Sequence, residues 1–247
     1  MHKIIIYQTL PRLFGNDCTD GVPGGSLQRN GCGKFNDYTK EALQDIRDLG
    51  VTHVWYTGVI AHASATAYPE AGIAAAPAAV LKGKAGSPYA IRDYYDVDPD
   101  LAVDVKTRMK EFEALVERTH RAGMRVIIDF VPNHVARVYH SDARPAGVED
   151  LGASDRTGLA FHPANNFYYI PDRPFVSPAP STDGIPYQER PARATGNDCF
   201  TATPSVNDWY ETVKLNYGVD YLHGGQTAFE PIPDTWLKMR DILRFWA

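Results

Sequence analysis

The sequence predicts an α/β protein built around a parallel sheet, because short apolar strands and amphipathic helices alternate along it. The third expected strand, residues 126–130, is rich in Val, Ile and Phe, which is typical of a strand buried on both faces. Gly123 ends the helix before this strand, and Pro132 ends the strand itself. Three strand-then-helix periods favour right-handed βαβ units.

The first half of the chain supplies these elements in order. Residues 3–8 form the expected first strand, and residues 36–50 form a helix whose apolar side chains share one face. Residues 51–57 are β-branched and aromatic, which predicts the second strand. Asp104 is expected to cap the next helix, which runs to Gly123 and leads into the third strand.

Residues 138–233 break this rhythm. They contain most of the chain's prolines and show no sustained helical or alternating period. We expect them to form an irregular subdomain inserted on the loop after the third strand. Asp234 is then a suitable cap for a helix that starts at Thr235, and the apolar stripe of that helix still continues at Trp246.

The expected organisation has three parts: strand–helix units in residues 1–137, the insertion in 138–233 and a further helix in 234–247. Three parallel strands cannot close a barrel, and they leave an apolar sheet edge unpaired. We therefore expect the chain to be the front part of a longer protein and to self-associate when isolated. A complete small α/β domain that ends abruptly is the alternative.

Composition excludes several classes of function. The 247 residues are 44% apolar and 22% charged, which is ordinary for a globular protein with a sizeable core. A net charge of −5 without a Lys/Arg run argues against a nucleic-acid partner. No apolar stretch is long enough to span a bilayer, and the apolar run near the N-terminus is too short for a signal peptide. These features predict no membrane partner and a cytoplasmic location.

The three cysteines, Cys18, Cys32 and Cys199, are few and odd in number. Free thiols in a reducing compartment fit this pattern best, and a Cys18–Cys32 disulfide is the alternative.

Polar side chains surround the carboxyl end of the third expected strand. Asp129, Asn133 and His134 lie there, which is where α/β barrels carry their chemistry. An Asp that caps a turn and an ordinary surface imidazole are the alternative reading. A second cluster, upstream in the chain, places tyrosines around Asp93.

These segments resemble the α-amylase family of glycoside hydrolases, family thirteen. The run D-F-V-P-N-H at 129–134 is similar to the family signature D-x-x-x-N-H after the third barrel strand. The run L-G-V-T-H-V-W at 49–55 resembles the second strand, and H-R-A-G-M-R-V-I-I-D at 120–129 resembles the approach to the third. The run P-Y-A-I-R-D-Y-Y-D-V-D-P at 88–99 resembles the aromatic segment before the second helix. Order and spacing match over nearly the whole chain.

The resemblance implies the front part of a (β/α)8 TIM barrel, with three strand–helix units and a B-domain insertion after the third strand. It implies a retaining, α-amylase-type hydrolase of starch, glycogen or maltooligosaccharides, whose two catalytic carboxylates lie roughly 5 Å apart. In the family these carboxylates follow later barrel strands, so we expect no catalytic residue within this chain and no activity from it alone. A transglycosylase or isomerase of the same family, or a non-catalytic glucan-binding scaffold, is the alternative.

The resemblance also assigns binding residues. Tyr89 matches the position that stacks on the sugar at the cleaved bond, and His134 matches the position that hydrogen-bonds its 6-hydroxyl. Asp93 matches the Asp that family members carry four residues after that Tyr, and we expect it to hold the loop. It is a third candidate for the substrate site. Asn133 matches a calcium ligand at the junction of barrel and B domain.

The sequence departs from the family at the calcium position. Many members carry D-L-N near the end of the B domain, with the Asp on the metal, whereas this chain reads K-L-N-Y-G from Lys214. An ammonium group cannot ligate calcium, but it can occupy a cation site. We expect Lys214 to approach Asn133 in place of the metal, and calcium on Asn133 is the alternative.

Overall fold

The computed structural model describes residues 3–247, which divide into two compact units. The first unit contains residues 3–75, 83–88 and 96–130, and the second contains residues 76–82, 89–95 and 131–247. The division therefore falls after Phe130, whereas the sequence places the boundary after residue 137. The C-terminal helix α4 (Asp234–Trp246) is part of the second unit.

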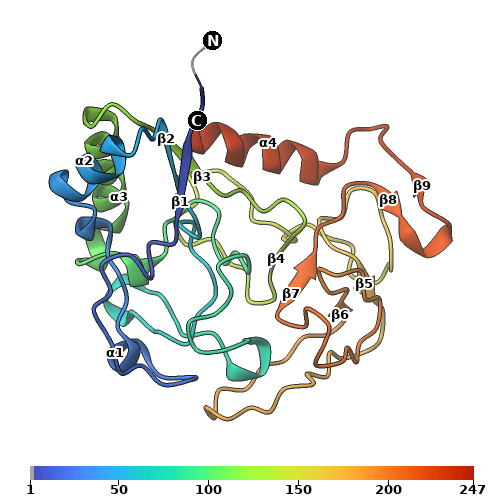
Figure 1. Cartoon of the computed structure of the whole chain (residues 1–247). Helices are drawn as coiled ribbons and strands as arrows, with labels where there is room; N and C mark the ends of the chain where they lie inside the picture. Colours follow the sequence, from blue (N-terminus) through green and yellow to red (C-terminus); the bar gives the residue numbers. More distant parts are fainter. Residues whose placement is uncertain (1–2) are drawn as a thin grey trace. The chain divides into compact units, whose positions relative to one another are not determined.

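A three-stranded parallel sheet forms the centre of the first unit. Its strands are β1 (Ile6–Thr9), β2 (His53–Tyr56) and β3 (Arg125–Ile128), and they are hydrogen-bonded in the order β1-β2-β3. Figure 1 shows the three strands close together. Val54 of β2 is opposite Tyr7 of β1 and Val126 of β3. The parallel arrangement expected from the sequence is thus confirmed.

The helices of the first unit are α1 (Leu27–Asn30), α2 (Lys40–Asp48) and α3 (Arg108–Arg121). Thr39 caps α2, because its side chain accepts a hydrogen bond from the amide of Ala42. The capping prediction for Asp104 is wrong for α3. Asp104 instead caps the preceding 3-10 turn (Val105–Thr107), and α3 begins after that turn.

The other 3-10 turns lie at Phe35–Asp37, Pro69–Ala71, Ala78–Val80, Pro99–Leu101 and Tyr221–His223.

The core of the first unit lies on β2 rather than on β3. Val54 and Tyr56 of β2 are fully buried together with Leu43 of α2 and Leu115 of α3. The prediction that the third strand is buried on both faces is wrong, since residues 126–128 are only half-buried. Within residues 3–247, β3 is an edge strand with a single neighbour, so part of its apolar surface stays exposed.

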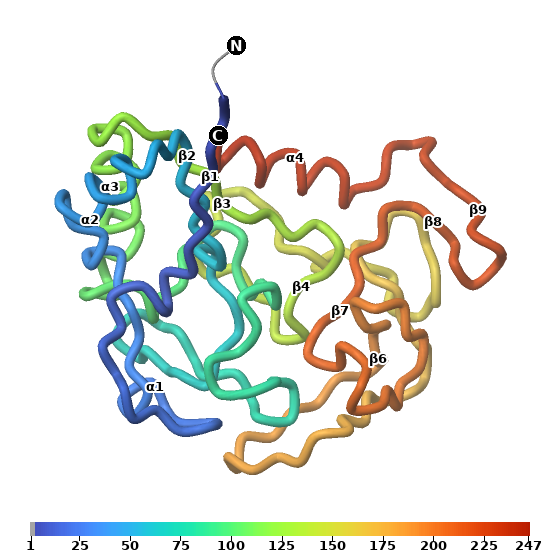
Figure 2. Tube along the Cα trace, viewed as in Figure 1, coloured from blue at the N-terminus to red at the C-terminus, as the bar shows by residue number. Residues whose placement is uncertain are grey.

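The second unit contains short antiparallel pairs, and five of their six strands, β5 to β9, lie in residues 138–233, where the sequence predicts irregular structure. β4 (His134–Ala136) pairs with β7 (Thr212–Lys214), as Figure 2 shows. β5 (Tyr169–Ile170) pairs with β6 (Ala192–Arg193), and β8 (Val219–Asp220) pairs with β9 (Gln226–Thr227).

A buried ionic network supports these strands. The Arg137 guanidinium donates to Glu189 Oε1 at 2.6 Å and lies over the Phe175 ring, 3.9 Å from its centroid. Arg193 donates to the other carboxylate oxygen of Glu189 at 2.7 Å. Burial alone would raise the pKa of Glu189, but the two guanidinium groups lower it below its ordinary value.

α4 begins one residue earlier than predicted, so Asp234 is its first residue rather than its cap. The Asp234 carboxylate accepts from Asn166 Nδ2 at 3.0 Å and pairs with Lys238 at 3.0 Å.

None of the helices in residues 3–247 combines the length and apolar character needed to cross a bilayer. The thiols of Cys18, Cys32 and Cys199 are all free.

Candidate functional site

His134 is the first residue of β4, where it lies opposite Lys214 of β7. Its side chain is 7% exposed. The imidazole Nδ1 lies 2.9 Å from Asn133 Nδ2, and the ring also hydrogen-bonds the backbone of Tyr89. The sequence places His134 just beyond the end of the third strand, and the structure shows that it begins a further strand paired with β7.

Tyr89 belongs to the same unit as His134 and is more exposed to solvent. Its residue is 43% exposed, while its backbone contacts the buried His134 ring. The structure therefore brings together the two residues that the resemblance assigns to sugar binding. One is a half-exposed aromatic residue, and the other is a buried polar imidazole.

The surroundings of His134 keep its imidazole neutral. Burial, with a smaller contribution from the nearby Lys214 ammonium, lowers the pKa of His134 to about 4. The hydrogen bond to the Tyr89 backbone acts in the opposite direction and is outweighed. A neutral imidazole exchanges hydrogen bonds with a hydroxyl group without attracting anions, which suits an uncharged ligand.

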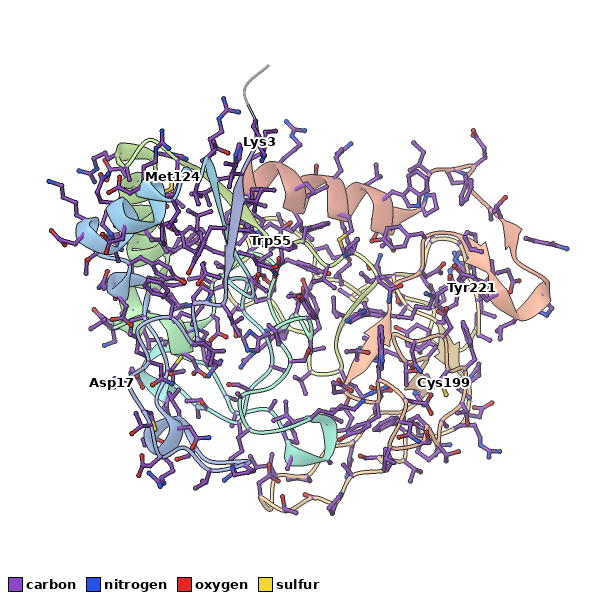
Figure 3. The ribbon with its side chains drawn as sticks, viewed as in Figure 1. Lys3, Asp17, Trp55, Met124, Cys199 and Tyr221 are labelled. Atoms are coloured by element: carbon purple, nitrogen blue, oxygen red, sulfur yellow. The ribbon has the colours of Figure 1, made fainter. Side chains whose placement is uncertain are left out.

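Lys214 is a buried cation next to Asn133. Its Nζ lies 2.5 Å from Asp198 Oδ1, 3.4 Å from Asn133 Oδ1 and 5.2 Å from the centroid of the Tyr221 ring, which Figure 3 labels. Asn133 Nδ2 also donates to the carbonyl of Gly196 at 2.8 Å. The expected approach of Lys214 to Asn133 is therefore present in the structure.

These donors do not fit calcium, which requires six to eight oxygen ligands. The side-chain oxygen of Asn133 faces an ammonium group, and its nitrogen faces away to Gly196. In the part of the chain that the structure describes, no group of three or more His, Cys, Asp or Glu side chains is arranged to hold a metal ion.

The carboxylate of Asp93 is used within its own loop. It is buried and accepts from the Tyr95 amide at 2.8 Å, the Ser141 hydroxyl at 2.5 Å and the Ala143 amide at 3.0 Å. These bonds tie the segment after Tyr89 to the segment after β4. The geometry favours a loop-holding role for Asp93 over direct contact with a sugar.

Sequence reasoning missed two residues that contact His134. The Trp209 ring packs edge-on against the imidazole with centroids 5.3 Å apart. A Cβ atom on Gly196 would lie 2.8 Å from the Cβ of His134, so only glycine fits there. Neither contact has a local signal, since an isolated Trp in N-D-W-Y and one glycine among 20 are ordinary features.

Asp129 belongs to the first unit, and the hydrogen bonds of its carboxylate are made within that unit. Its carboxylate accepts from Trp55 Nε1, labelled in Figure 3, and from the Gly58 amide at 2.8 Å. It therefore links the ends of β3 and β2.

A groove of about 510 Å³ between α2 and α3, lined in part by Lys40 and Arg118, contains none of the sugar-site candidates.

Parallel strands that alternate with helices place the first unit in the α/β class of proteins. The particular family follows from comparison with known proteins. Residues 8–157 match the family described as alpha amylase, catalytic domain, and the chain belongs to this family.

Relatives differ in what they do. The chain is 27% identical to Maltase 1 of Drosophila virilis over 151 residues, which cover 60% of this chain and 18% of the maltase. It is 42% identical to the amino acid transporter heavy chain SLC3A1 of Mus musculus over 131 residues, which cover 53% of this chain and 14% of the heavy chain. The chain thus spans less than a fifth of the length of these curated relatives.

The fold agrees with that of a solved α-amylase. The structure from Lactobacillus plantarum superimposes with a TM-score of 0.50 and 20% identity, covering 98% of this chain and 35% of the amylase. At this identity the likeness establishes the shared fold only.

Proposed function

We propose that the second unit of this chain is the sugar-binding corner of an α-glucan-active, retaining glycosidase of the α-amylase type. The observation that carries this proposal is the contact between the buried His134 imidazole and the backbone of the half-exposed Tyr89. A glucosyl residue has an apolar face and a rim of hydroxyl groups, so an exposed ring beside a fixed imidazole suits it. In this proposal Tyr89 stacks on the ring, and His134 hydrogen-bonds the 6-hydroxyl.

The proposed substrate is a linear α-glucan or a maltooligosaccharide, for which family membership and the maltase relative both argue. Asp93 contributes indirectly, because its hydrogen bonds fix the loop that follows Tyr89.

We further propose that the 247-residue chain binds sugar without cleaving it. Retaining hydrolysis needs a nucleophile and an acid/base that face the same glycosidic bond, about 5 Å apart. The carboxylates near the site have other partners, since Asp93 holds its loop and Asp198 pairs with Lys214. Starch hydrolysis by the purified chain above a mock purification would contradict this part of the proposal.

Binding is tested by isothermal titration of maltotriose into the wild-type chain and two variants. Tyr89→Ala removes the ring and His134→Gln removes the imidazole, and each is expected to weaken binding about tenfold or more. Phe229→Ala is the matched control, because Phe229 lies in the same unit and is 41% exposed. Equal affinities for wild type, Tyr89→Ala and His134→Gln would refute the proposal.

A non-catalytic role is the second candidate, and the resemblance to a transporter heavy chain favours it. Chromatography of maltooligosaccharides incubated with the complete gene product separates the candidates. Shortened products indicate a hydrolase, lengthened or rearranged products indicate a transglycosylase or isomerase, and unchanged sugar indicates a scaffold.

The site also leads us to propose that Lys214 replaces calcium beside Asn133. Its ammonium group is buried and is held by Asp198, Asn133 and the Tyr221 ring. A positive charge fixed in this way would hold the same loops together without a metal.

A further inference from the structure

Trp209 is a feature of the second unit that the proposed roles of Tyr89 and His134 leave unexplained. Its residue is 44% exposed, although large aromatic side chains are highly buried on average. The indole packs against His134 at an interplanar angle of 63°. Tyr89 contacts the same imidazole through its backbone. Two half-exposed aromatic residues therefore meet at one buried histidine.

The backbone of Trp209 is fixed on both sides. Its amide donates to Asn197 Oδ1 at 3.1 Å, and its carbonyl accepts from the amide and the hydroxyl of Thr212, each at 2.9 Å. Asn197 is itself held, because its Nδ2 donates to Asp208 Oδ1 at 2.9 Å. A ring presented from such a constrained backbone loses little conformational entropy when it binds a ligand.

The indole N–H of Trp209 is available to a ligand. The other tryptophans, Trp55, Trp236 and Trp246, each donate Nε1–H to a protein acceptor. Within residues 3–247, the Trp209 Nε1–H has no protein acceptor. An exposed apolar ring with a free donor at its edge matches the apolar face and hydroxyl rim of a sugar.

We propose that Trp209 is a second stacking platform, which binds the glucosyl residue next to the one on Tyr89. The second unit then recognises at least two consecutive glucosyl residues of a linear α-glucan. This inference rests on the proposed function of Tyr89 and His134 and extends it to chain length. A single glucosyl ring engages one platform, whereas a maltooligosaccharide engages both.

The test compares methyl α-glucoside with maltotriose on the 247-residue chain, by isothermal titration and by the indole N–H signals in NMR spectra. The wild type is expected to bind maltotriose about tenfold more tightly than methyl α-glucoside. Trp209→Ala is expected to bind maltotriose no more tightly than methyl α-glucoside, whereas Trp209→Phe is expected to keep most of the difference in affinity. Trp236→Ala is the matched control, because Trp236 is 46% exposed in the same unit, and it is expected to behave as wild type.

The outcomes separate the inference from the proposed function. If Trp209→Ala keeps the difference in affinity while Tyr89→Ala loses affinity, the inference is wrong and the proposed function stands. If the wild type binds neither sugar, both are wrong. If Trp209→Ala does not fold, the wild-type spectrum decides: a Trp209 indole signal that shifts with maltotriose supports the inference, and an unmoved signal contradicts it.

Discussion

At the scale of single residues, His134 is a buried polar group with hydrogen-bond partners of its own. The partners of its ring are Asn133 and the Tyr89 backbone. Burial penalises the charged form, so the imidazole stays neutral over the pH range in which most proteins work. The same burial makes the folded state sensitive to acid.

The first prediction concerns pH and stability. The pKa of His134 falls from an ordinary 6.5 to about 4 on folding, so the unfolded chain binds more protons between these values. The contribution of the neutral His134 to the free energy of unfolding is fully present above pH 6.5 and is lost as the pH falls through 4. We expect the free energy of urea unfolding to fall more steeply from pH 6.5 to pH 4 for wild type than for His134→Gln. Parallel curves would contradict this.

The second prediction concerns the close packing of Gly196 against His134. Gly196→Ala would place a methyl group 2.8 Å from His134 Cβ and 2.6 Å from Thr212 Oγ1. We expect a stability loss of about 1–3 kcal/mol from overpacking, together with weaker maltotriose binding. Gly158→Ala is the control, because a Cβ there meets nothing within 4 Å. An unchanged Gly196→Ala variant would show that His134 moves freely.

At the scale of elements, the pairing of β4 with β7 positions the residues of the candidate site. It sets His134 opposite Lys214, and the loop before β7 brings Trp209 to the imidazole. Sequence patterns predict the first-unit strands and helices because their periodicity is local. They do not predict β4 and β7. Each of these strands has three residues, which is too short to show an alternating pattern, and the two strands are far apart in the chain.

The third prediction concerns the cation at this pairing. Lys214→Asp would exchange the ammonium group for a carboxylate beside Asn133 and Asp198. We expect calcium to raise the melting temperature of Lys214→Asp and to leave that of wild type unchanged. Lys214→Met should be destabilised and unresponsive to calcium. A calcium-dependent rise in the wild type would contradict the proposal that Lys214 replaces the metal.

The fourth prediction concerns the ionic network that supports these strands. Glu189→Gln removes the charge that compensates Arg137 and Arg193, and the buried Arg137 then lacks its counterion. We expect a loss of about 3–5 kcal/mol in the free energy of unfolding. Glu117→Gln removes the exposed partner of Arg121 and should cost less than about 1 kcal/mol. Similar losses in both variants would show that the network is not buried.

At the scale of the whole molecule, the sequence predicts the family and the parallel order of the first three strands, and both are confirmed. The sequence overestimates the burial of β3. The apolar composition of this strand suits a covered sheet, but composition does not show whether a neighbouring strand is present. Motifs lead to the predicted roles of Tyr89, His134 and Lys214, whereas the contacts of Trp209 and Gly196 with His134 become visible only when distant segments are brought together.

The fifth prediction concerns the sheet edges. Within the described residues, β1 and β3 are edge strands, and Ile4 and Ile6 are exposed. Unpaired edges with exposed apolar side chains favour association between chains. We expect sedimentation equilibrium to show an apparent mass that rises with protein concentration. A monomer that persists at high concentration would contradict this.

The central claim is that Tyr89 and His134 form one α-glucan-binding corner. The most direct measurement is a crystal structure of the chain with bound maltotriose. The claim predicts a glucosyl ring stacked on Tyr89 with its 6-hydroxyl within hydrogen-bond distance of the His134 imidazole. A sugar bound elsewhere, with neither residue in contact with it, would contradict the claim.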